Sequence, residues 1–242
     1  MISANSDKLV RSLHKKKYRI KNNKFILEGI RTIDCAINND TSFSFIIYTK
    51  RFSNQNPELI SKINCKTTEI VSEKEMGKLS PSKSPSGILA IANMIDYGQF
   101  NNDNNVVFLD EISDPGNMGT IIRTAAWFGI YQIALSPGCI DPYNPKVVRS
   151  AMGSHFSLSW IGEKEISSLK NYVLIGADQN SKNKQLDKLI DKWALVMGSE
   201  SHGISKKTRS YLDQSIGITK IGDGESLNIG VAMGILLHKM TK

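Results

Sequence analysis

The chain has few cysteines and histidines, and this shortage excludes several kinds of site. Its three cysteines, Cys35, Cys65 and Cys139, are odd in number and widely spaced, so the sequence predicts neither a disulfide framework nor a cysteine metal site. Four scattered histidines, among them His155 and His202, lack the spacing of zinc ligands. We therefore expect reduced thiols, a cytoplasmic location and no bound metal.

Long apolar runs are also lacking. No stretch approaches the roughly 18 apolar residues of a membrane span, and the N-terminus has no apolar block of the kind found in secretory signals. A Gly-x-Gly-x-x-Gly fingerprint after the first strand is absent too, which argues against dinucleotide binding at Gly222 and Gly224. The chain does have 242 residues, 40% of them hydrophobic and 22% charged, which suffices for one large core or two smaller ones.

The net charge of +8 is concentrated at the N-terminus. Residues 1–24 hold eight Lys or Arg and a single Asp, a charge of +7, so the rest of the chain is nearly neutral. Such a segment attracts a polyanion such as nucleic acid with salt-dependent affinity. A frayed, solvated terminus is the alternative; an acidic membrane is disfavoured because bulky apolar residues are few. The candidate nucleic-acid contacts are Lys15, Lys16, Lys17 and Arg19.

Alternating strand and helix patterns predict an α/β protein with two domains, at residues 1–97 and 106–242, joined by a polar linker at 98–105. In the first, a smaller α/β/α domain, we expect a basic helix at 5–16, further helices at 30–38, after Pro57 and after Ser72, and strands at 24–29, 45–48, 68–71 and 87–92. In the second we expect strands at 106–110, 131–135, 155–160, 172–177, 193–198 and 214–219, and helices at 119–128, 145–152, 205–212 and 227–240. Its near-continuous apolar strands indicate a mostly parallel sheet.

Three polar loops follow strands of the second domain. In the first, residues 114–117 form a turn, and a helix beginning near Gly119 carries Arg123 one turn in. Asn117 offers an amide donor and acceptor, and Arg123 a cationic fork suited to phosphate. Two more loops, at 198–205 and 222–228, are rich in glycine and polar residues. Open α/β sheets bind ligands at such loops, beyond the carboxyl ends of their strands.

Together these loops resemble the three motifs of the SpoU/TrmH family of RNA ribose 2′-O-methyltransferases, within the SPOUT superfamily. The matching segments are Asp114-Pro-Gly-Asn117-x-Gly119-x-x-x-Arg123-Thr124-Ala125, Gly198-x-Glu200-x-x-Gly203 and Ser226-Leu227-Asn228-x-x-Val231-Ala232, with an intermediate segment at 141–150. Residues 24–92 resemble the family's substrate-binding domain, related to a ribosomal-protein fold. One departure is Thr219, where the family usually has a proline, and it predicts a less rigid loop.

The resemblance implies a deep trefoil knot in the C-terminal domain, S-adenosylmethionine (SAM) bound in that knot, and a homodimer that completes the active site. It implies catalytic roles for Arg123, Asn117, Glu200, Ser226 and Asn228. It places the cofactor at Gly198, Gly203, Ile218, Gly222 and Leu227. We add Lys146 and Arg149 of the intermediate segment to the candidate RNA contacts.

Each of these residues also has a purely structural interpretation. Asn117 could serve only its turn, Asn228 or Ser226 could only cap the last helix, and Glu200 could be a solvated or salt-bridged carboxylate. Arg123 is harder to explain structurally, because burying an arginine on an otherwise apolar helix is costly. Its guanidinium stays protonated at neutral pH and is a poor general base, so we expect it to clamp phosphate or stabilise charge.

The sequence favours ribosomal RNA of the 23S type over transfer RNA, since an N-terminal domain of this kind more often accompanies ribosomal RNA methylation. Two alternatives stay open. One is a non-catalytic paralogue that binds RNA or ribosome precursors. The other is a SPOUT base methyltransferase, for example one acting on guanine N1.

Overall fold

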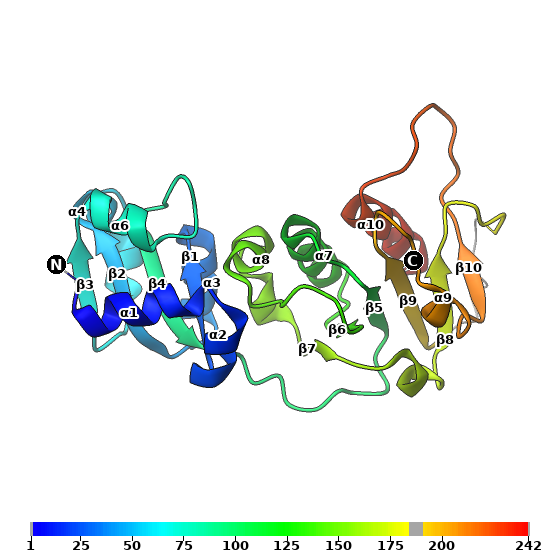
Figure 1. Cartoon of the computed structure of the whole chain (residues 1–242), viewed down its shortest axis with the longest axis horizontal. Helices are drawn as coiled ribbons and strands as arrows, with labels where there is room; N and C mark the ends of the chain where they lie inside the picture. The colour runs from blue at the N-terminus through cyan, green and yellow to red at the C-terminus, as the bar shows by residue number, and fades with distance from the viewer. Residues whose placement is uncertain (1, 184–190, 242) are drawn as a thin grey trace. The chain divides into compact units, whose positions relative to one another are not determined.

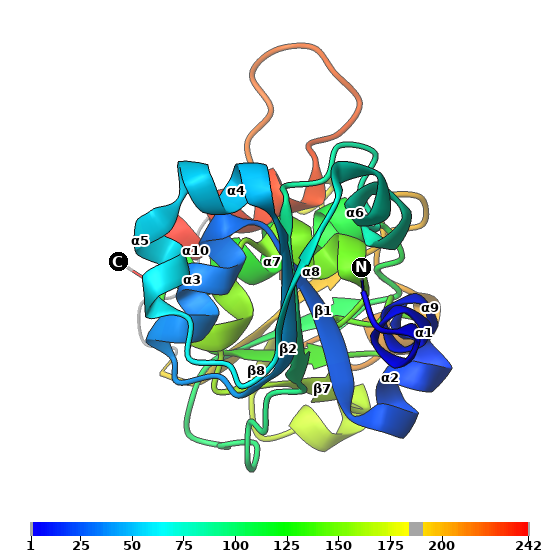
Figure 2. The same ribbon diagram turned by 90° about the vertical axis from the view of Figure 1, so that its left-hand side faces the viewer.

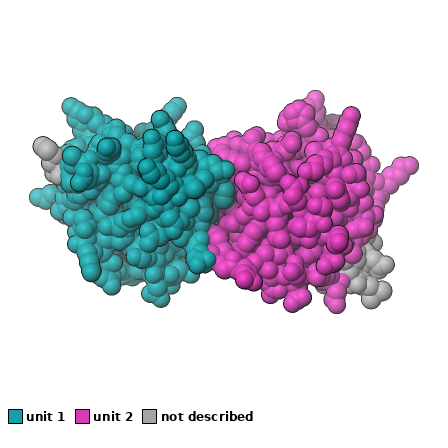
Figure 3. Space-filling view, turned by 60° about the horizontal axis from the view of Figure 1, so that its bottom comes forward, with its two compact units in different colours: residues 1–96, 141–156 teal, residues 97–140, 157–242 magenta. Residues whose placement is uncertain are grey.

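A computed structural model describes residues 2–183 and 191–241. The chain divides into two compact units, shown in Figure 3. Unit 1 contains Met1–Asp96 and Asp141–Phe156, and unit 2 contains Tyr97–Ile140 and Ser157–Lys242. None of the described helices is long and apolar enough to cross a membrane.

Unit 1 is an α/β/α sandwich built on a mixed four-stranded sheet of order β1-β4-β2-β3, in which only the β2–β3 pair is parallel. Its strands are β1 (Lys24–Glu28), β2 (Phe43–Thr49), β3 (Thr68–Val71) and β4 (Ile88–Asn93). Its helices are α1 (Ala4–Leu13), α2 (Lys16–Asn22), α3 (Ile30–Asn38), α4 (Lys50–Gln55), α5 (Pro57–Lys62), α6 (Glu73–Leu79) and α8 (Pro145–Ala151). Figure 2 shows α3, α4 and α5 on one face of the sheet and α1 and α6 on the other. The predicted α/β/α fold is confirmed.

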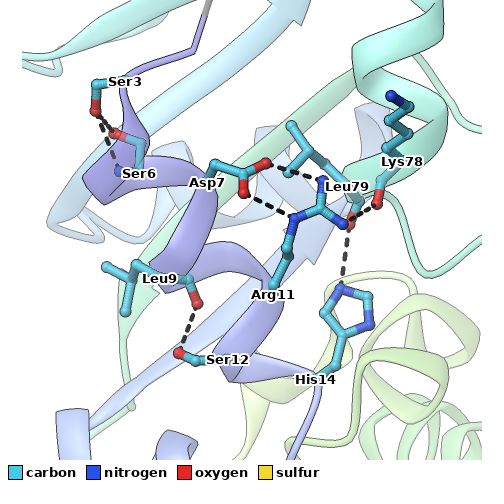
Figure 4. Close-up of polar contacts among 9 residues, drawn as sticks. All are labelled: Ser3, Ser6, Asp7, Leu9, Arg11, Ser12, His14, Lys78 and Leu79. Atoms are coloured by element: carbon cyan, nitrogen blue, oxygen red, sulfur yellow. Dashed lines mark hydrogen bonds and ion pairs between the residues drawn. The ribbon is translucent and has the colours of Figure 1, made fainter.

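The basic N-terminal segment is folded onto unit 1. Val10 and Leu13 of α1 are fully buried in the core formed with β2, β4 and α6. Figure 4 shows how the polar side of α1 meets the end of α6: Arg11 donates to the Lys78 carbonyl at 3.4 Å, and a ring nitrogen of His14 lies 3.1 Å from the Leu79 carbonyl. Apolar burial on one side and hydrogen bonds on the other fix this helix. The frayed-terminus alternative is therefore wrong.

The helix expected at 5–16 is α1, which ends at Leu13, and it is followed by a second helix, α2, that was not expected. Lys15, between α1 and α2, has an extended backbone (φ −104°, ψ 132°), which ends the first helix and redirects the second. As a result Arg19 of α2 points inward and is only 1% exposed. The periodic run of basic residues hid this break, because no proline or glycine marks it.

The segment 141–156 belongs to unit 1, although it lies more than forty residues beyond β4 in the chain. Arg19 forms an ion pair with Asp141, and its Nη1 donates to the Leu13 carbonyl at 2.8 Å. The rings of Phe25 and Tyr143 meet edge to face at 4.8 Å between centroids. The expected boundaries (1–97, 98–105 and 106–242) stay a prediction, and these contact units differ from them in where they place this segment.

Unit 2 is built on a six-stranded parallel sheet of order β10-β8-β9-β5-β6-β7. Its strands are β5 (Val106–Asp110), β6 (Gln132–Leu135), β7 (Trp160–Glu163), β8 (Val173–Ala177), β9 (Trp193–Gly198) and β10 (Gln214–Ile216). Its α-helices are α7 (Pro115–Trp127), α9 (Lys206–Arg209) and α10 (Ile229–Met240), with a 3₁₀ turn η2 at Ile166–Leu169. Every residue of β5 and β6 is buried, as expected of a covered parallel sheet. The prediction of such a sheet is confirmed.

The helix expected at 205–212 and the strand expected at 214–219 are shorter in the structure, and three further expectations differ. Helix α7 begins at Pro115 rather than near Gly119, because Asp114 accepts a hydrogen bond from the Asn117 N–H and caps it. The strand expected at 155–160 is replaced by a 3₁₀ turn η1 (Ser154–Ser157) and the later strand β7. Helix α10 begins only at Ile229, since Asn228 is its N-cap. Ser226 is therefore not the cap of this helix.

Candidate functional site

The three polar loops lie beyond the carboxyl ends of β5, β9 and β10. β5 and β9 are neighbours in the sheet, with Asp110 paired to Gly198. After β5 the chain crosses to β6 on one side, and after β9 it crosses to β10 on the other side. Crossovers that leave in opposite directions create a crevice, which is where open α/β sheets bind ligands. Figure 1 shows the connection from β10 to α10, in orange, extending away from the sheet.

Asn228 joins all three loops. Its side-chain oxygen caps α10 by accepting from the Gly230 and Val231 N–H groups at 3.0 and 3.4 Å. Its Nδ2 donates to Asn117 Oδ1 at 2.9 Å and to Glu200 Oε1 at 3.2 Å. The same amide therefore caps α10 and bridges the other two loops.

Asn117 and Glu200 are held from their own loops as well. The Asn117 N–H donates to Asp114 Oδ1 at 2.8 Å, which fixes it in the first turn of α7. Glu200 Oε1 also lies 3.5 Å from the Ile229 N–H, at the positive end of α10, where a carboxylate is stabilised. Asn117 is half-buried and Glu200 exposed, so both can reach a ligand from one fixed cluster.

Two glycines let these elements approach closely. A Cβ on Gly198 would lie 2.2 Å from the Gly203 carbonyl carbon and from the Ile204 nitrogen, so the loop can fold back on itself only with glycine there. A Cβ on Gly230 would lie 2.5 Å from Thr120 Cγ2, so this glycine sets the close packing of α10 on α7. The Asn117–Asn228 contact depends on that packing.

A cavity of about 920 Å³ lies next to this cluster in unit 2. It is lined by the loops that follow β8, β9 and β10 and by the first turns of α10. Its walls include all five residues expected at the cofactor, together with Glu200 and Ser226: Gly198, Gly203, Ile218, Gly222 and Leu227. Its volume is within the range of small-molecule sites.

Arg123 does not join this cluster within one chain. Its side chain is exposed on α7, and among the described residues it forms no hydrogen bond or ion pair. The argument that Arg123 is costly to bury therefore does not apply to the single chain. Ser226 is likewise exposed, on the loop that leads to α10. The structure brings together three of the five residues expected to be catalytic.

The candidate RNA contacts are all in unit 1, and one of them is wrong. Arg19 is buried and paired with Asp141, so it cannot meet a phosphate. Three lysines beside it are exposed around the start of α2, and two basic residues are exposed on α8: Lys15, Lys16, Lys17, Lys146 and Arg149.

His155 is a structural residue of unit 1. Burial lowers its pKa from 6.5 to about 4, so the ring is neutral at pH 7, and its Nε2 lies 2.8 Å from the Pro142 carbonyl. Among residues 2–183 and 191–241, no group of three His, Cys, Asp or Glu is arranged to hold a metal.

Sequence reasoning did not find the structural roles of two carboxylates, the buried Asp110 and the part-buried Asp141. Asp110 is 2% exposed, and its Oδ2 accepts from the Ser205 N–H at 2.7 Å. Its position as the only charged residue of an otherwise apolar strand was the available signal. Nothing local distinguished Asp141, because its partner Arg19 is 122 positions away.

Comparison with known proteins agrees with this geometry. Residues 104–238 match the SpoU rRNA Methylase family, and residues 6–90 match the MRM3-like substrate binding domain. The 23S rRNA (guanosine(2553)-2′-O)-methyltransferase RlmP of Bacillus subtilis is 29% identical, over 95% of this chain and 93% of that protein. A 23S rRNA (uridine(2479)-2′-O)-methyltransferase of Streptomyces viridochromogenes is 24% identical, over 93% of this chain and 84% of that protein.

The fold is also that of a solved relative, the SpoU methyltransferase AviRb from Streptomyces viridochromogenes in complex with AdoMet. The TM-score is 0.83 at 22% identity, over 99% of this chain and 97% of that one. The family match spans more than half of the chain and contains all three loops of the site. This chain therefore belongs to the SpoU rRNA methylase family.

Proposed function

We propose that this protein transfers a methyl group from SAM to a ribose 2′-hydroxyl of ribosomal RNA. The observation that carries the proposal is the Asn117–Asn228–Glu200 cluster, which joins the three motif loops beside the large cavity of unit 2. The relatives named above act on 23S ribosomal RNA, which favours that substrate class. One of them acts on a guanosine and the other on a uridine, so the ribose rather than the base is the shared target.

The cavity fits SAM, the cofactor bound in the AviRb structure. The fold-back of residues 198–204 at Gly198 exposes backbone groups to the cavity without an intervening side chain. Leu227 and Ile229 add apolar surface, and the Asp178 carboxylate, paired with Arg209 at 2.7 Å, adds charge at the wall. Bound there, SAM supplies an electrophilic methyl group on a sulfonium. The trefoil knot that the family resemblance implies stays a prediction.

The residues of the chain would position the ribose. Asn117 and Glu200 keep free hydrogen-bonding capacity beside the cavity, so they can orient a hydroxyl for in-line attack, and positioning of this kind can supply much of the rate acceleration. Arg123 carries a guanidinium, which is a poor proton acceptor, so it would bind the phosphate of the target nucleotide or stabilise developing charge rather than remove the proton. Ser226, on the cavity wall, is the remaining polar group we assign to this arrangement.

We also propose that the site is completed in a homodimer. Arg123 is exposed on α7, and one helical turn further Trp127 is 85% exposed. Val231 on α10, which packs against α7, is 51% exposed. An exposed tryptophan one turn from Arg123 offers a large apolar area for a second copy to bury. If a second copy covers these side chains, Trp127→Glu will give a monomer by light scattering and lose methyl transfer; a dimeric, active variant would refute this arrangement.

The RNA would be bound by the basic surface of unit 1. Lys17 and Lys21 lie four residues apart on the outer face of α2, opposite the buried Arg19, with the half-exposed Tyr18 (37%) beside them. Lysines can neutralise phosphates, and an exposed aromatic ring can stack on an unpaired base. We expect the protein in the cytoplasm, where ribosomal RNA of this class is modified.

The test is transfer of tritiated methyl from SAM into total RNA, followed by nucleoside analysis. We expect label in 2′-O-methylnucleosides of 23S-type ribosomal RNA. Label in a methylated base would favour the base methyltransferase, label in transfer RNA would replace the substrate, and SAM binding or RNA binding without transfer would favour a non-catalytic paralogue.

A further inference from the structure

Asp110 lies at the meeting point of the motif loops, and the family comparison assigns it no role. It is the last residue of β5, it is 2% exposed, and it is paired in the sheet with Gly198, where the 198–205 loop begins. Its Oδ2 accepts the N–H of Ser205, where the same loop ends, at 2.7 Å. Asp110 therefore meets both ends of the loop that carries Glu200, through its backbone at Gly198 and through its buried carboxylate at Ser205.

The loop between these ends is tightly folded. Ser199 and Gly203 form an antiparallel bridge, with the Gly203 N–H donating to the Ser199 carbonyl at 2.8 Å. Ser205 in turn caps α9 by accepting from the Thr208 N–H at 3.2 Å. Because the loop is internally rigid, fixing Ser205 also fixes the place of Glu200 relative to β5.

We infer that Asp110 is a positioning residue for methyl transfer: its carboxylate holds the 198–205 loop so that Glu200 reaches Asn228 and the loop backbone lines the cofactor cavity. Without this bond the Ser205 N–H, at the far end of the loop, loses its acceptor at the end of β5. Glu200 would then lose its fixed contact with Asn228 Nδ2 (3.2 Å), and the wall formed by residues 197–204 would shift. The inference rests on the proposed function of the same site.

The experiment compares Asp110→Ala and Asp110→Asn with a control, Asp213→Ala. Asp213 makes the same kind of bond in the same unit, accepting the Leu174 N–H at 2.8 Å, but it is exposed and lies outside the motif loops and the cavity. For Asp110→Ala we expect the Kd for SAM to rise about tenfold and the rate of methyl transfer to fall by at least as much, as for a lost hydrogen bond to a charged group. Asp110→Asn, which keeps an acceptor oxygen, restores most of both values. Asp213→Ala leaves both within about twofold of the wild type.

A double-mutant cycle with Glu200→Gln separates positioning from general stability. If Asp110 acts through the Glu200 loop, the double variant is no slower than the slower single variant, because residues in one network are not additive. The inference would be overturned if the rate losses of the two single variants multiply in the double variant. It would also be overturned if Asp110→Ala matches Asp213→Ala in SAM affinity and rate. A wild-type protein that methylates no RNA would instead refute the proposed function. If Asp110→Ala fails to fold, Ser205→Pro removes the same bond from the donor side at a φ of −59° that proline adopts. It should show the loss expected of Asp110→Ala, and wild-type SAM affinity and rate in this variant would overturn the inference.

Discussion

Arg123 is the residue to which we propose the largest share of the chemistry. Replacing it with alanine should reduce methyl transfer about a hundredfold or more, as expected when a charge-stabilising group is lost, and leave the Kd for SAM unchanged. The cavity wall does not include Arg123, so cofactor binding has no reason to change. Methyl-transfer rates and calorimetric SAM titration measure the two effects. Arg51→Ala, an exposed arginine of unit 1, is the control; an Arg123→Ala protein with normal turnover would remove this residue from the mechanism.

His155 makes stability depend on pH. Its pKa is about 4 in the folded protein and 6.5 in the unfolded chain, because burial disfavours the charged ring. Its contribution is complete above pH 6.5 and is lost as the pH falls toward 4, since protons then bind the unfolded chain preferentially. Between pH 7 and pH 5 the free energy of unfolding should fall by about 2 kcal/mol more in the wild type than in His155→Gln.

Urea unfolding at the two pH values measures this difference. His202→Gln, at an exposed position, should follow the wild type closely. An equal pH dependence in the wild type and in His155→Gln would show that the histidine is not buried neutral.

For single residues, the sequence indicated which side chains share a site, but not which basic side chain is buried. The resemblance of their loops to the family motifs implied a shared site for Asn117, Glu200 and Asn228, and the structure joins these residues through one amide. Arg19 was predicted as an RNA contact because its neighbours are lysines, yet it is the one inward-facing residue of α2. Helical phase decides which basic residue points inward, and a break without a proline or glycine leaves that phase undefined.

Among the elements, α2 carries the basic surface that we expect to bind RNA. Replacing Lys15, Lys16 and Lys17 together with glutamine should weaken RNA binding and flatten its salt dependence, since each lost phosphate contact lowers the slope of log K against log salt by about 0.7 to 0.9. Filter binding at several salt concentrations measures both. A matched triple variant at three exposed lysines elsewhere on unit 1 is the control: Lys50, Lys66 and Lys74. If the two triple variants have equal slopes of log K against log salt, the three lysines at α2 make no special contribution to RNA binding.

Caps mark the starts of both α6 and α7, but only the start of α6 was predicted. The Ser72 capping box begins α6 as expected, with Glu75 returning a bond to the Ser72 N–H at 2.9 Å. The start of α7 was predicted too late, although Asp114-Pro115 is a standard cap followed by an N1 proline. The strand expected at 155–160 failed for a tertiary reason, because His155 is buried against the Pro142 carbonyl instead of in the sheet.

At the scale of the whole molecule, contact units do not follow the order of the chain. The parallel sheet of unit 2 could be predicted, because its strands are local apolar runs. The inclusion of residues 141–156 in unit 1 could not, because it depends on contacts such as Arg19–Asp141 and Phe25–Tyr143, over a hundred positions apart. Unit 1 therefore needs a segment that lies within the family's catalytic sequence match.

The Arg19–Asp141 pair shows how strongly that segment is held. The side chains are 2% and 11% exposed, so Asp141→Ala would leave a buried guanidinium without its counter-charge, at a cost of about 3–5 kcal/mol in the free energy of unfolding. Asp34→Ala, which removes an exposed pair with Lys62 (37% and 54% exposed), should cost below about 1 kcal/mol. Urea denaturation of the full chain measures both.

Replacing both Arg19 and Asp141 with apolar residues of similar size should recover most of the loss, because no unpaired charge then stays buried. Hydrogen exchange should locate the loss seen in Asp141→Ala in β1, α2 and α8, the elements that contact one another around the pair, and leave the strands of unit 2 protected. If Asp141→Ala costs no more than Asp34→Ala, the segment 141–156 is not an integral part of unit 1, and the unit can form from residues 1–96 alone.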